Sequence, residues 1–188
     1  GKPYAQSDLQ RVVAGNTLPT WFGGWSNNFK YKNFDLLVFF QFSGGNKIYN
    51  GSTATLSDVR FWNNSVDYKN NYWTPEHTNA KYALPVYGDN YSNGSAMPIT
   101  DWVEKGDYIR LKNIALGYTF DHKHLFDVLG VSSLRLYLQA QNLFVLTGYS
   151  GLDPEVLSQT QSPNLADGTD HNTTPQARTF TLGAQIVF

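Results

Sequence analysis

The chain has 188 residues, no cysteine and a formal charge of −1 at pH 7. Its length allows one domain with a core, and the lack of cysteine excludes disulfides and thiolate metal sites. The near-neutral charge gives no electrostatic case for nucleic acid as a partner. Aromatic residues make up 15% of the sequence, which favours strands. No run approaches the roughly 18 consecutive apolar residues of a membrane-spanning helix.

Residues 1–18 show no periodicity and are predicted to be a linker or a preceding loop, with a turn at residues 14–16. The opening Gly1-Lys2-Pro3 carries no signal-peptide pattern. We interpret it either as the remnant of a tag or as the cut end of a longer chain.

Alternation of apolar and polar residues begins at residue 19 and predicts a first strand over residues 19–32 and a second over 35–43. The apolar parity of the first strand holds Trp21, Trp25, Phe29 and Tyr31, and that of the second holds Leu36, Val38, Phe40 and Phe42. A short turn at residues 32–34 joins the two strands, so the pattern indicates a hairpin.

Residues 44–106 are rich in Asn, Tyr, Trp, Ser and Pro and show no strand period. They are predicted to form a long loop that is not a core, with a short helix near residues 56–64. A loop of this length argues against an ordinary compact domain.

A third strand is predicted over residues 108–120. Ile114 and Leu116 share one face with Tyr118, but Arg110 and Lys112 have the same parity as Ile114. Either a β-bulge or emergence of the first half into water explains this change of phase.

The next segment, residues 121–133, is a short connection in which we expect one helical turn ended by Gly130. A fourth strand is predicted over residues 134–147, and residues 148–177 are a second long polar loop.

The last strand, over residues 178–188, has the strictest alternation in the chain. Its apolar parity holds Phe180, Leu182, Ala184, Ile186 and Phe188. The length fits the roughly 9–11 residues with which a tilted strand crosses a bilayer, and these five side chains are the lipid-facing candidates. The same pattern also suits the last strand of a soluble sandwich.

Connections between the five predicted strands alternate between short and long, so the short turns fall on one side of the sheet and the long loops on the other. Outer-membrane barrels segregate their loops in this way, whereas a soluble sandwich has no reason to do so. Trp21, Tyr31, Tyr108 and Tyr118, near strand ends, would then be interfacial residues.

Several short motifs follow one another along residues 5–188. Among them are Trp21-Phe22-Gly23-Gly24, Asn33-Phe34-Asp35-Leu36, Gly44-Gly45-Asn46-Lys47, Tyr72-Trp73-Thr74-Pro75-Glu76, Tyr108-Ile109-Arg110-Leu111, Gln141-Asn142-Leu143-Phe144, Gly151-Leu152-Asp153-Pro154-Glu155 and Pro175-Gln176-Ala177-Arg178. Together they resemble the C-terminal part of the SusC/RagA family of TonB-dependent outer-membrane transporters of Bacteroidetes-type bacteria.

The resemblance implies an all-β fold, in which antiparallel strands form the C-terminal segment of a large outer-membrane β-barrel with two long extracellular loops. Proteins of this family have an N-terminal plug and a barrel of about 22 strands. They import glycan or peptide fragments captured by a SusD-like surface lipoprotein, powered through TonB. With about five strands this chain departs from the family by its length, and contact with TonB is expected through the missing N-terminal part.

Aromatic residues of the long loops are candidates for stacking on a sugar ring or for contacting the lipoprotein. They are Trp62, Tyr72, Trp73, Tyr82, Tyr87 and Tyr91. The alternative is that these rings pack against one another. Polar strand residues, namely Asn27, Lys30, Gln41, Arg135, Gln139 and Gln141, are either lumen-lining or simply a solvated face.

Three groups of polar residues could suggest a site, but for each we favour a solvated turn or surface. His122 and His124 lack a third ligand, and the residues around Asp167 and Asp170 lack the ligand positions of a Ca²⁺ loop. Nothing places Glu104 across a cleft from another carboxylate, as a glycosidase requires. Without a catalytic motif, we expect no enzymatic activity, no cofactor and no metal.

Two alternatives stay open at this point. One is a soluble carbohydrate-binding β-sandwich that uses the loop aromatics. The other is a soluble fragment that folds differently and buries its apolar faces by oligomerisation.

Overall fold

The computed structural model describes residues 11–58, 63–86, 99–120, 130–155 and 168–188. The chain divides into two compact units. The first, called the loop unit below, comprises Gly1–Leu18, Gly45–Gly106 and Tyr149–Thr174. The second, the sheet unit, comprises Pro19–Gly44, Asp107–Gly148 and Pro175–Phe188.

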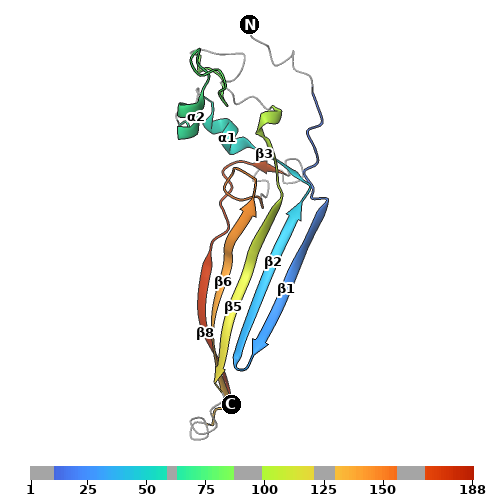
Figure 1. Ribbon diagram of the computed structural model, residues 1–188, viewed down its shortest axis with the longest axis vertical. Helices are drawn as coiled ribbons and strands as arrows, with labels where there is room; N and C mark the ends of the chain where they lie inside the picture. Colours follow the sequence, from blue (N-terminus) through green and yellow to red (C-terminus); the bar gives the residue numbers. More distant parts are fainter. Residues whose placement is uncertain (1–10, 59–62, 87–98, 121–129, 156–167) are drawn as a thin grey trace. The chain divides into compact units, whose positions relative to one another are not determined.

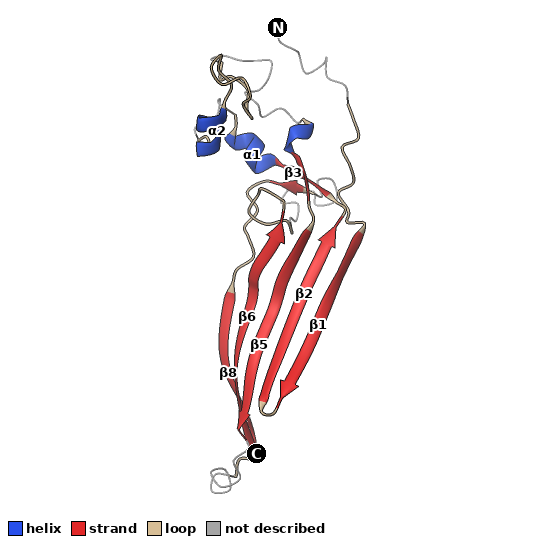
Figure 2. Ribbon diagram, in the orientation of Figure 1, coloured by secondary structure: helices blue, strands red, loops and turns tan. Residues whose placement is uncertain are grey.

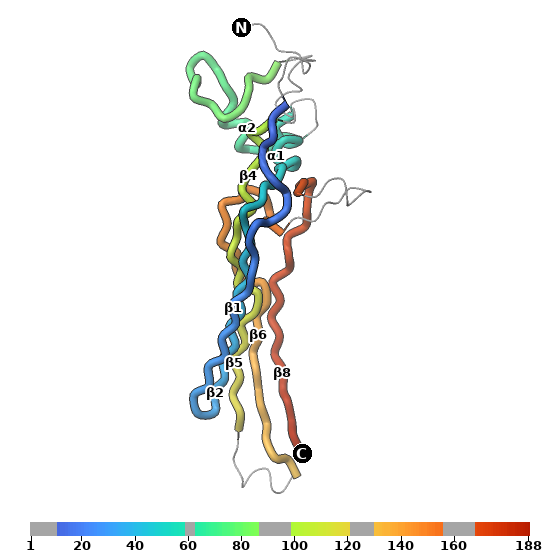
Figure 3. The backbone as a smooth tube through the Cα atoms, turned by 90° about the vertical axis from the view of Figure 1, so that its right-hand side faces the viewer, coloured from blue at the N-terminus to red at the C-terminus, as the bar shows by residue number. Residues whose placement is uncertain are grey.

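The sheet unit is one five-stranded sheet in the order β1-β2-β5-β6-β8, in which every neighbouring pair is antiparallel (Figure 1). Its strands are β1 (Trp21–Tyr31), β2 (Phe34–Gly44), β5 (Tyr108–Phe120), β6 (Ser133–Thr147) and β8 (Thr179–Val187). Figure 3 shows these strands from the side, as a single layer. The predicted antiparallel all-β class is confirmed.

The short connection between β1 and β2 consists of Lys32 and Asn33. Lys32 has a φ of 51°, in the left-handed region, which lets the chain reverse within two residues. The helical turn predicted within residues 121–133 falls largely outside the described residues. Gly130, the residue predicted to end it, has a φ of 66°, which suits glycine.

The change of phase in β5 is a β-bulge. Phe40 pairs with Leu111 whereas Phe39 pairs with Asn113, so Lys112 has no partner position on β2. The register between β5 and β6 shifts at the same place. Of the two explanations that the sequence left open, the structure supports the bulge, which places Leu111 on the same face as Ile114 although the two residues differ in parity.

The two faces of this sheet differ in chemistry. The apolar face is formed by Trp25, Phe29, Leu36, Val38, Phe40, Leu111, Ile114, Leu116, Leu136, Leu138, Phe180, Leu182, Ala184 and Ile186, which the register places beside one another. The opposite face, called the polar face, contains Ser26, Asn28, Lys30, Asp35, Gln41, Asn113, Thr119, Arg135, Gln139 and Gln185, together with the apolar residues Phe22, Leu37 and Phe39. Asn27 pairs with Val38 and lies on the apolar face, so grouping it with the polar residues was wrong.

The loop unit contains a small three-stranded sheet and short helices (Figure 2). The sheet has the order β4-β3-β7, with β3 at Lys47–Asn50, β4 at Val103–Lys105 and β7 at Thr169–Asp170. The helices are α1 (Gly51–Leu56), α2 (Val66–Asn71) and the 3-10 helix η3 (Thr100–Trp102). Strand β3 pairs with β7, so both predicted loops contribute to one sheet.

Local capping sets where the two α-helices begin. The side chain of Asn50 accepts a hydrogen bond from the Thr53 amide at α1, and that of Ser65 accepts one from the Tyr68 amide at α2. Each cap satisfies a backbone donor that has no partner inside the helix. Of the helix predicted near residues 56–64, only Leu56 is helical among the described residues, because α1 ends there and residues 57–58 and 63–64 are not helical. Residues 59–62 lie outside the described part of the chain.

A buried aromatic cluster gives the loop unit its core. It consists of Ala54, Tyr68, Tyr82 and Trp102, against which Tyr49, Tyr72 and Ile99 pack. The prediction that residues 44–106 are not a core was therefore wrong. The cluster draws single residues from α1, α2, η3 and the segment before it, and such spacing produces no periodic signal in a sequence.

Within the described part of the chain, no helix has the length and hydrophobicity needed to cross a membrane.

Candidate functional surfaces

The apolar face of the sheet is exposed. Leu182 is 81% exposed and Phe180 is 67% exposed, and Ile186 and Phe188 are exposed as well. Ala184 lies between Leu182 and Ile186 on the same parity of β8, opposite Leu136 of β6. The lipid-facing candidates thus continue a face that crosses all five strands. A soluble monomer rarely exposes an apolar surface of this kind.

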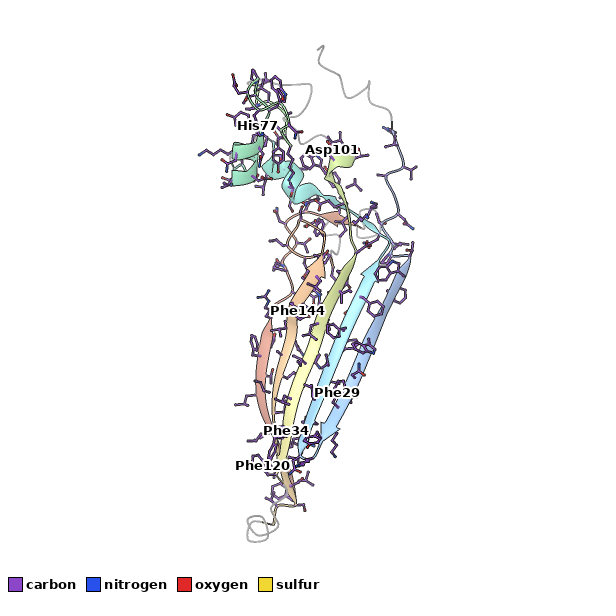
Figure 4. The ribbon with its side chains drawn as sticks, viewed as in Figure 1. Phe29, Phe34, His77, Asp101, Phe120 and Phe144 are labelled. Carbon is purple, nitrogen blue, oxygen red and sulfur yellow. The ribbon has the colours of Figure 1, made fainter. Side chains whose placement is uncertain are left out.

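Aromatic rings gather near both ends of this face. At one end Trp25 stacks on Phe40, with ring centroids 5.9 Å apart, and Phe40 meets Phe144 edge-on at 6.5 Å. At the other end Phe34 lies edge-on to Tyr118 at 4.7 Å. Figure 4 labels Phe34 and Phe144, which mark the two groups. Two aromatic bands that flank aliphatic residues are typical of strands that cross a membrane.

Three of the four predicted interfacial residues, Trp21, Tyr31 and Tyr118, lie on the apolar face. Tyr108 does not: it is buried, and its hydroxyl accepts a hydrogen bond of 3.0 Å from Nε2 of Gln41 on the polar face. The bulge at Lys112 moves Tyr108 to the polar face.

On the polar face, Arg135 of β6 reaches across β5 to Asp35 of β2. Arg135 Nε donates to Asp35 Oδ1 at 2.9 Å, and Nη2 forms a second contact with Oδ2. The pair lies over Gly117, where an added Cβ would come within 2.5 Å of both side chains. A glycine at that position therefore leaves the room that this two-point ion pair needs.

Three of the six loop aromatics predicted as contact residues can be placed. Tyr82 is 4% exposed and packs against Tyr68 at 5.2 Å and Trp102 at 6.1 Å. Tyr72 stacks on Tyr68 at 6.2 Å, and Trp73 is 38% exposed at the surface. Trp62, Tyr87 and Tyr91 lie outside the described residues. The structure thus brings Tyr72 and Tyr82 into one cluster and leaves Trp73 accessible.

Asp67 connects α2 to the segment that carries Tyr82. Its carboxylate accepts hydrogen bonds from the Tyr82 hydroxyl at 2.6 Å, the Lys81 Nζ at 3.0 Å and the Asn71 amide at 2.6 Å. These donors, Tyr82 foremost, lower the pKa of Asp67 to about 2. Burial raises the pKa of Tyr82, so the hydroxyl keeps the proton that it donates.

A cavity of about 340 Å³ lies beside α2. It is lined by Asn64, Ser65, Val66, Tyr68, Lys69, Tyr72 and Pro85. Aromatic faces next to amide, hydroxyl and ammonium groups suit a small polar ligand with one apolar side.

Polar side chains that the sequence analysis missed hold the loop unit together. Asn50, which is fully buried, donates to both Glu104 Oε1 and Ser150 Oγ at 3.0 Å. The Tyr149 hydroxyl donates to Asp170 Oδ2 at 2.6 Å, and burial raises the pKa of Tyr149. Because the partners are 21 to 100 residues apart, no local motif could reveal them.

Glu104 and Asp170 are thus hydrogen-bond acceptors in this network. Glu104 also accepts from the Ser150 amide at 2.8 Å, and Asp170 is 2% exposed. Within the described ranges, no group of three or more His, Cys, Asp or Glu side chains could hold a metal ion. His122, His124 and Asp167 lie outside these ranges.

Comparison with known proteins gives relatives over nearly the whole chain, although no family model matches it. The TonB-dependent receptor P3 of Formosa agariphila is 33% identical over 185 residues, which are 97% of this chain and 18% of that protein. The TonB-dependent receptor SusC of Bacteroides thetaiotaomicron is 29% identical over 166 residues, 88% of this chain and 15% of SusC. The chain therefore spans less than a fifth of these relatives.

Solved structures share the fold. The RagAB peptide transporter matches with a TM-score of 0.75 and 23% identity, over 97% of this chain and 19% of the matched one. The RagAB peptide importer in its open-open state matches with a TM-score of 0.74 at the same identity and the same coverage of both chains. The similarity in sequence and the similarity in fold each cover 97% of this chain. The chain belongs to the SusC/RagA family of TonB-dependent receptors.

Proposed function

We propose that this chain forms part of the wall and the extracellular loops of an outer-membrane importer of nutrients. The observation that carries the proposal is the exposed apolar face of an open sheet whose opposite face is polar. Lipid would cover the apolar face, and the polar face would line the interior of a barrel. Phe180, Leu182, Ala184, Ile186 and Phe188 then contact lipid.

The two edges of the sheet support the same assignment. Strands β1 and β8 each pair with one neighbour within the described sheet, so each presents a row of backbone donors and acceptors on its other side. In lipid such groups must be satisfied by further strands, because no water reaches them. We assign that role to additional strands of the same polypeptide, which would close the barrel and remove both edges.

The loop unit would face the medium and contact the imported ligand or a SusD-like lipoprotein. Trp73 is exposed, and Tyr72 lines the cavity beside α2, so both are accessible for stacking. Trp62, Tyr87 and Tyr91 belong to this proposed surface by residue type, while Tyr82 would support it from within the cluster.

The ligand is proposed to be a glycan or peptide fragment. The solved RagAB structures are described as those of a peptide importer. Energy would come from TonB through a part of the polypeptide outside this chain. No observation favours the alternative of a carbohydrate-binding sandwich, because the described sheet unit contains one sheet with an exposed apolar face.

An antibody against residues 178–188 tests this function in the source organism. The proposal predicts that the antibody detects a polypeptide several times larger than 21.2 kDa in the outer-membrane fraction. A soluble polypeptide of about the mass of this chain would contradict it and would direct attention to binding assays on Trp73 variants.

A further inference from the structure

A cationic cavity lies on the polar face of the sheet, at the end where β1 turns into β2. Its volume is about 330 Å³, at the low end of the roughly 300–1,000 Å³ typical of ligand pockets. It is lined by Lys30, Lys32, Asn33, Asp35, Thr119 and Arg135. The turn, the end of β5 and the start of β6 each contribute to it.

The charges around this cavity do not balance. Lys30, Lys32 and Arg135 are cationic, and Asp35 is the one carboxylate among the described lining residues. Arg135 already engages Asp35 with two contacts. Lys30 is the register partner of Asp35, and Nζ of Lys32 lies 5.5 Å from the centroid of the Tyr31 ring. Three cationic side chains therefore share one carboxylate among the described lining residues, while the Asn33 amide and the Thr119 hydroxyl add neutral hydrogen-bonding groups.

The rest of the sheet supplies no second anion. All residues of β1, β2, β5, β6 and β8 are described, and Asp35 is the only Asp or Glu among them. The same strands contain Lys30, Arg110, Lys112 and Arg135. Electrostatic complementarity therefore calls for carboxylates or another anion from outside the sheet.

We propose that this cavity, defined by Lys30, Lys32 and Arg135, docks an acidic peptide segment whose carboxylates pair with the two lysines. A peptide is favoured over a lipid headgroup because the cavity opens on the polar face, whereas acyl chains would pack on the opposite, apolar face. The choice of a peptide over a lipid rests on the proposed function, whereas the presence of a cationic site does not depend on it.

The pairing of Arg135 with Asp35 fixes the geometry of the site. The two-point contact over Gly117 holds the guanidinium in place, so Arg135 contributes a fixed positive charge while the exposed lysines adapt to the incoming segment. Lys30 and Lys32 are exposed, so their substitution should leave the sheet folded.

The test uses the polypeptide that carries this chain, purified in detergent, and a fluorescein-labelled peptide of sequence Glu-Asp-Glu-Asp. Fluorescence anisotropy measures its Kd for the wild type and for the double variant Lys30→Gln, Lys32→Gln. Hydrogen bonds between charged groups are stronger than those between neutral groups. We therefore expect the double variant to bind the acidic peptide at least about tenfold more weakly than the wild type does. The matched control is Arg11→Gln, Lys105→Gln, which removes two exposed cations of the loop unit and should change Kd less than about twofold.

Three results would overturn the proposal. One is equal binding of a Gln-Asn-Gln-Asn peptide, and another is equal weakening by the two double variants, which would indicate non-specific attraction. In the third, micelles containing phosphatidylglycerol displace the acidic peptide through the same lysines, and a lipid headgroup replaces the peptide as occupant. The antibody experiment fails or succeeds independently of all three, because it reports location and mass alone.

Discussion

The sheet unit and the loop unit differ in where they place large apolar side chains. In the sheet unit Leu182 and Phe180 are among the exposed residues, whereas in the loop unit Trp102 and Tyr82 are buried. The loop unit follows the rule for a protein surrounded by water. The sheet unit inverts that rule on one face, which is the arrangement expected if lipid covers that face, as proposed above.

Truncation of the loop unit's largest buried ring should have the largest effect. Trp102 is 5% exposed and stacks on Tyr82 at 6.1 Å. Trp102→Ala should lower the free energy of unfolding of the loop unit by about 3–5 kcal/mol, because it removes packing and leaves a cavity. Trp73→Ala, at an exposed ring, should cost less than about 1 kcal/mol. Hydrogen exchange of residues 47–58 measures both, and equal losses would contradict a core at Trp102.

A charge introduced on the apolar face should cause the second largest loss in the free energy of unfolding. Leu182→Arg should cost about 2–4 kcal/mol in lipid if the residue lies near the bilayer midplane. Thr181→Arg is the matched control, since Thr181 is the neighbouring residue on the opposite parity of β8. Urea unfolding of the membrane-bound polypeptide gives both values, and an equal cost for the two variants would show that the faces do not differ in environment.

Removal of one buried hydroxyl should weaken the loop unit without affecting the sheet. Tyr149→Phe deletes the donor that Asp170 Oδ2 receives at 2.6 Å. Because Asp170 is 2% exposed, the loss should cost about 1–3 kcal/mol. Faster hydrogen exchange is expected at β3 and β7, which pair with each other. Faster exchange in β5 and β6 instead would contradict this localised role.

The Asp67 carboxylate should make a smaller contribution to the stability of the loop unit, and this contribution should be lost at low pH. Its pKa in the folded protein, about 2, lies below its ordinary value of 3.8. The stabilisation is therefore present above the ordinary value and is lost as pH falls through the folded-state value. Because the Asp67 side chain is 49% exposed, solvent screening keeps the effect below about 1 kcal/mol.

The unfolding free energies of the wild type and of Asp67→Asn should therefore converge as pH falls from about 5 to about 2. Asp101→Asn, at an exposed carboxylate of the same unit, serves as the control. A difference that stays constant over this range would contradict the assigned role of the Asp67 carboxylate.

The strands of the sheet could be predicted because apolar and polar residues alternate along them. Alternation over residues 178–188 predicts β8 and its apolar face, and the phase conflict between Lys112 and Ile114 predicted either a bulge or emergence into water, of which the structure shows the bulge. Both signals are local, because a strand places every second residue on one face. Asn27 shows where residue type misleads: its amide suggested the polar face, but its position in β1 places it on the apolar face, opposite Val38.

The loop unit was not open to prediction in the same way. Its core joins Ala54, Tyr68, Tyr82 and Trp102, and its buried polar network joins Asn50 to Ser150 over 100 residues of sequence. Such contacts depend on tertiary structure, and residue type alone gave two open roles for Tyr82. Only its burial distinguishes packing from ligand contact.

In the proposed function one face of the sheet contacts lipid and the other does not. Cysteine is absent from this chain, so Leu182→Cys and Thr181→Cys each give a single labelling position within it. With a bimane fluorophore on the membrane-bound polypeptide, the account predicts that doxyl lipids quench the label at Leu182 and that aqueous iodide quenches the label at Thr181. Equal quenching at both positions, or the reverse pattern, would contradict the account.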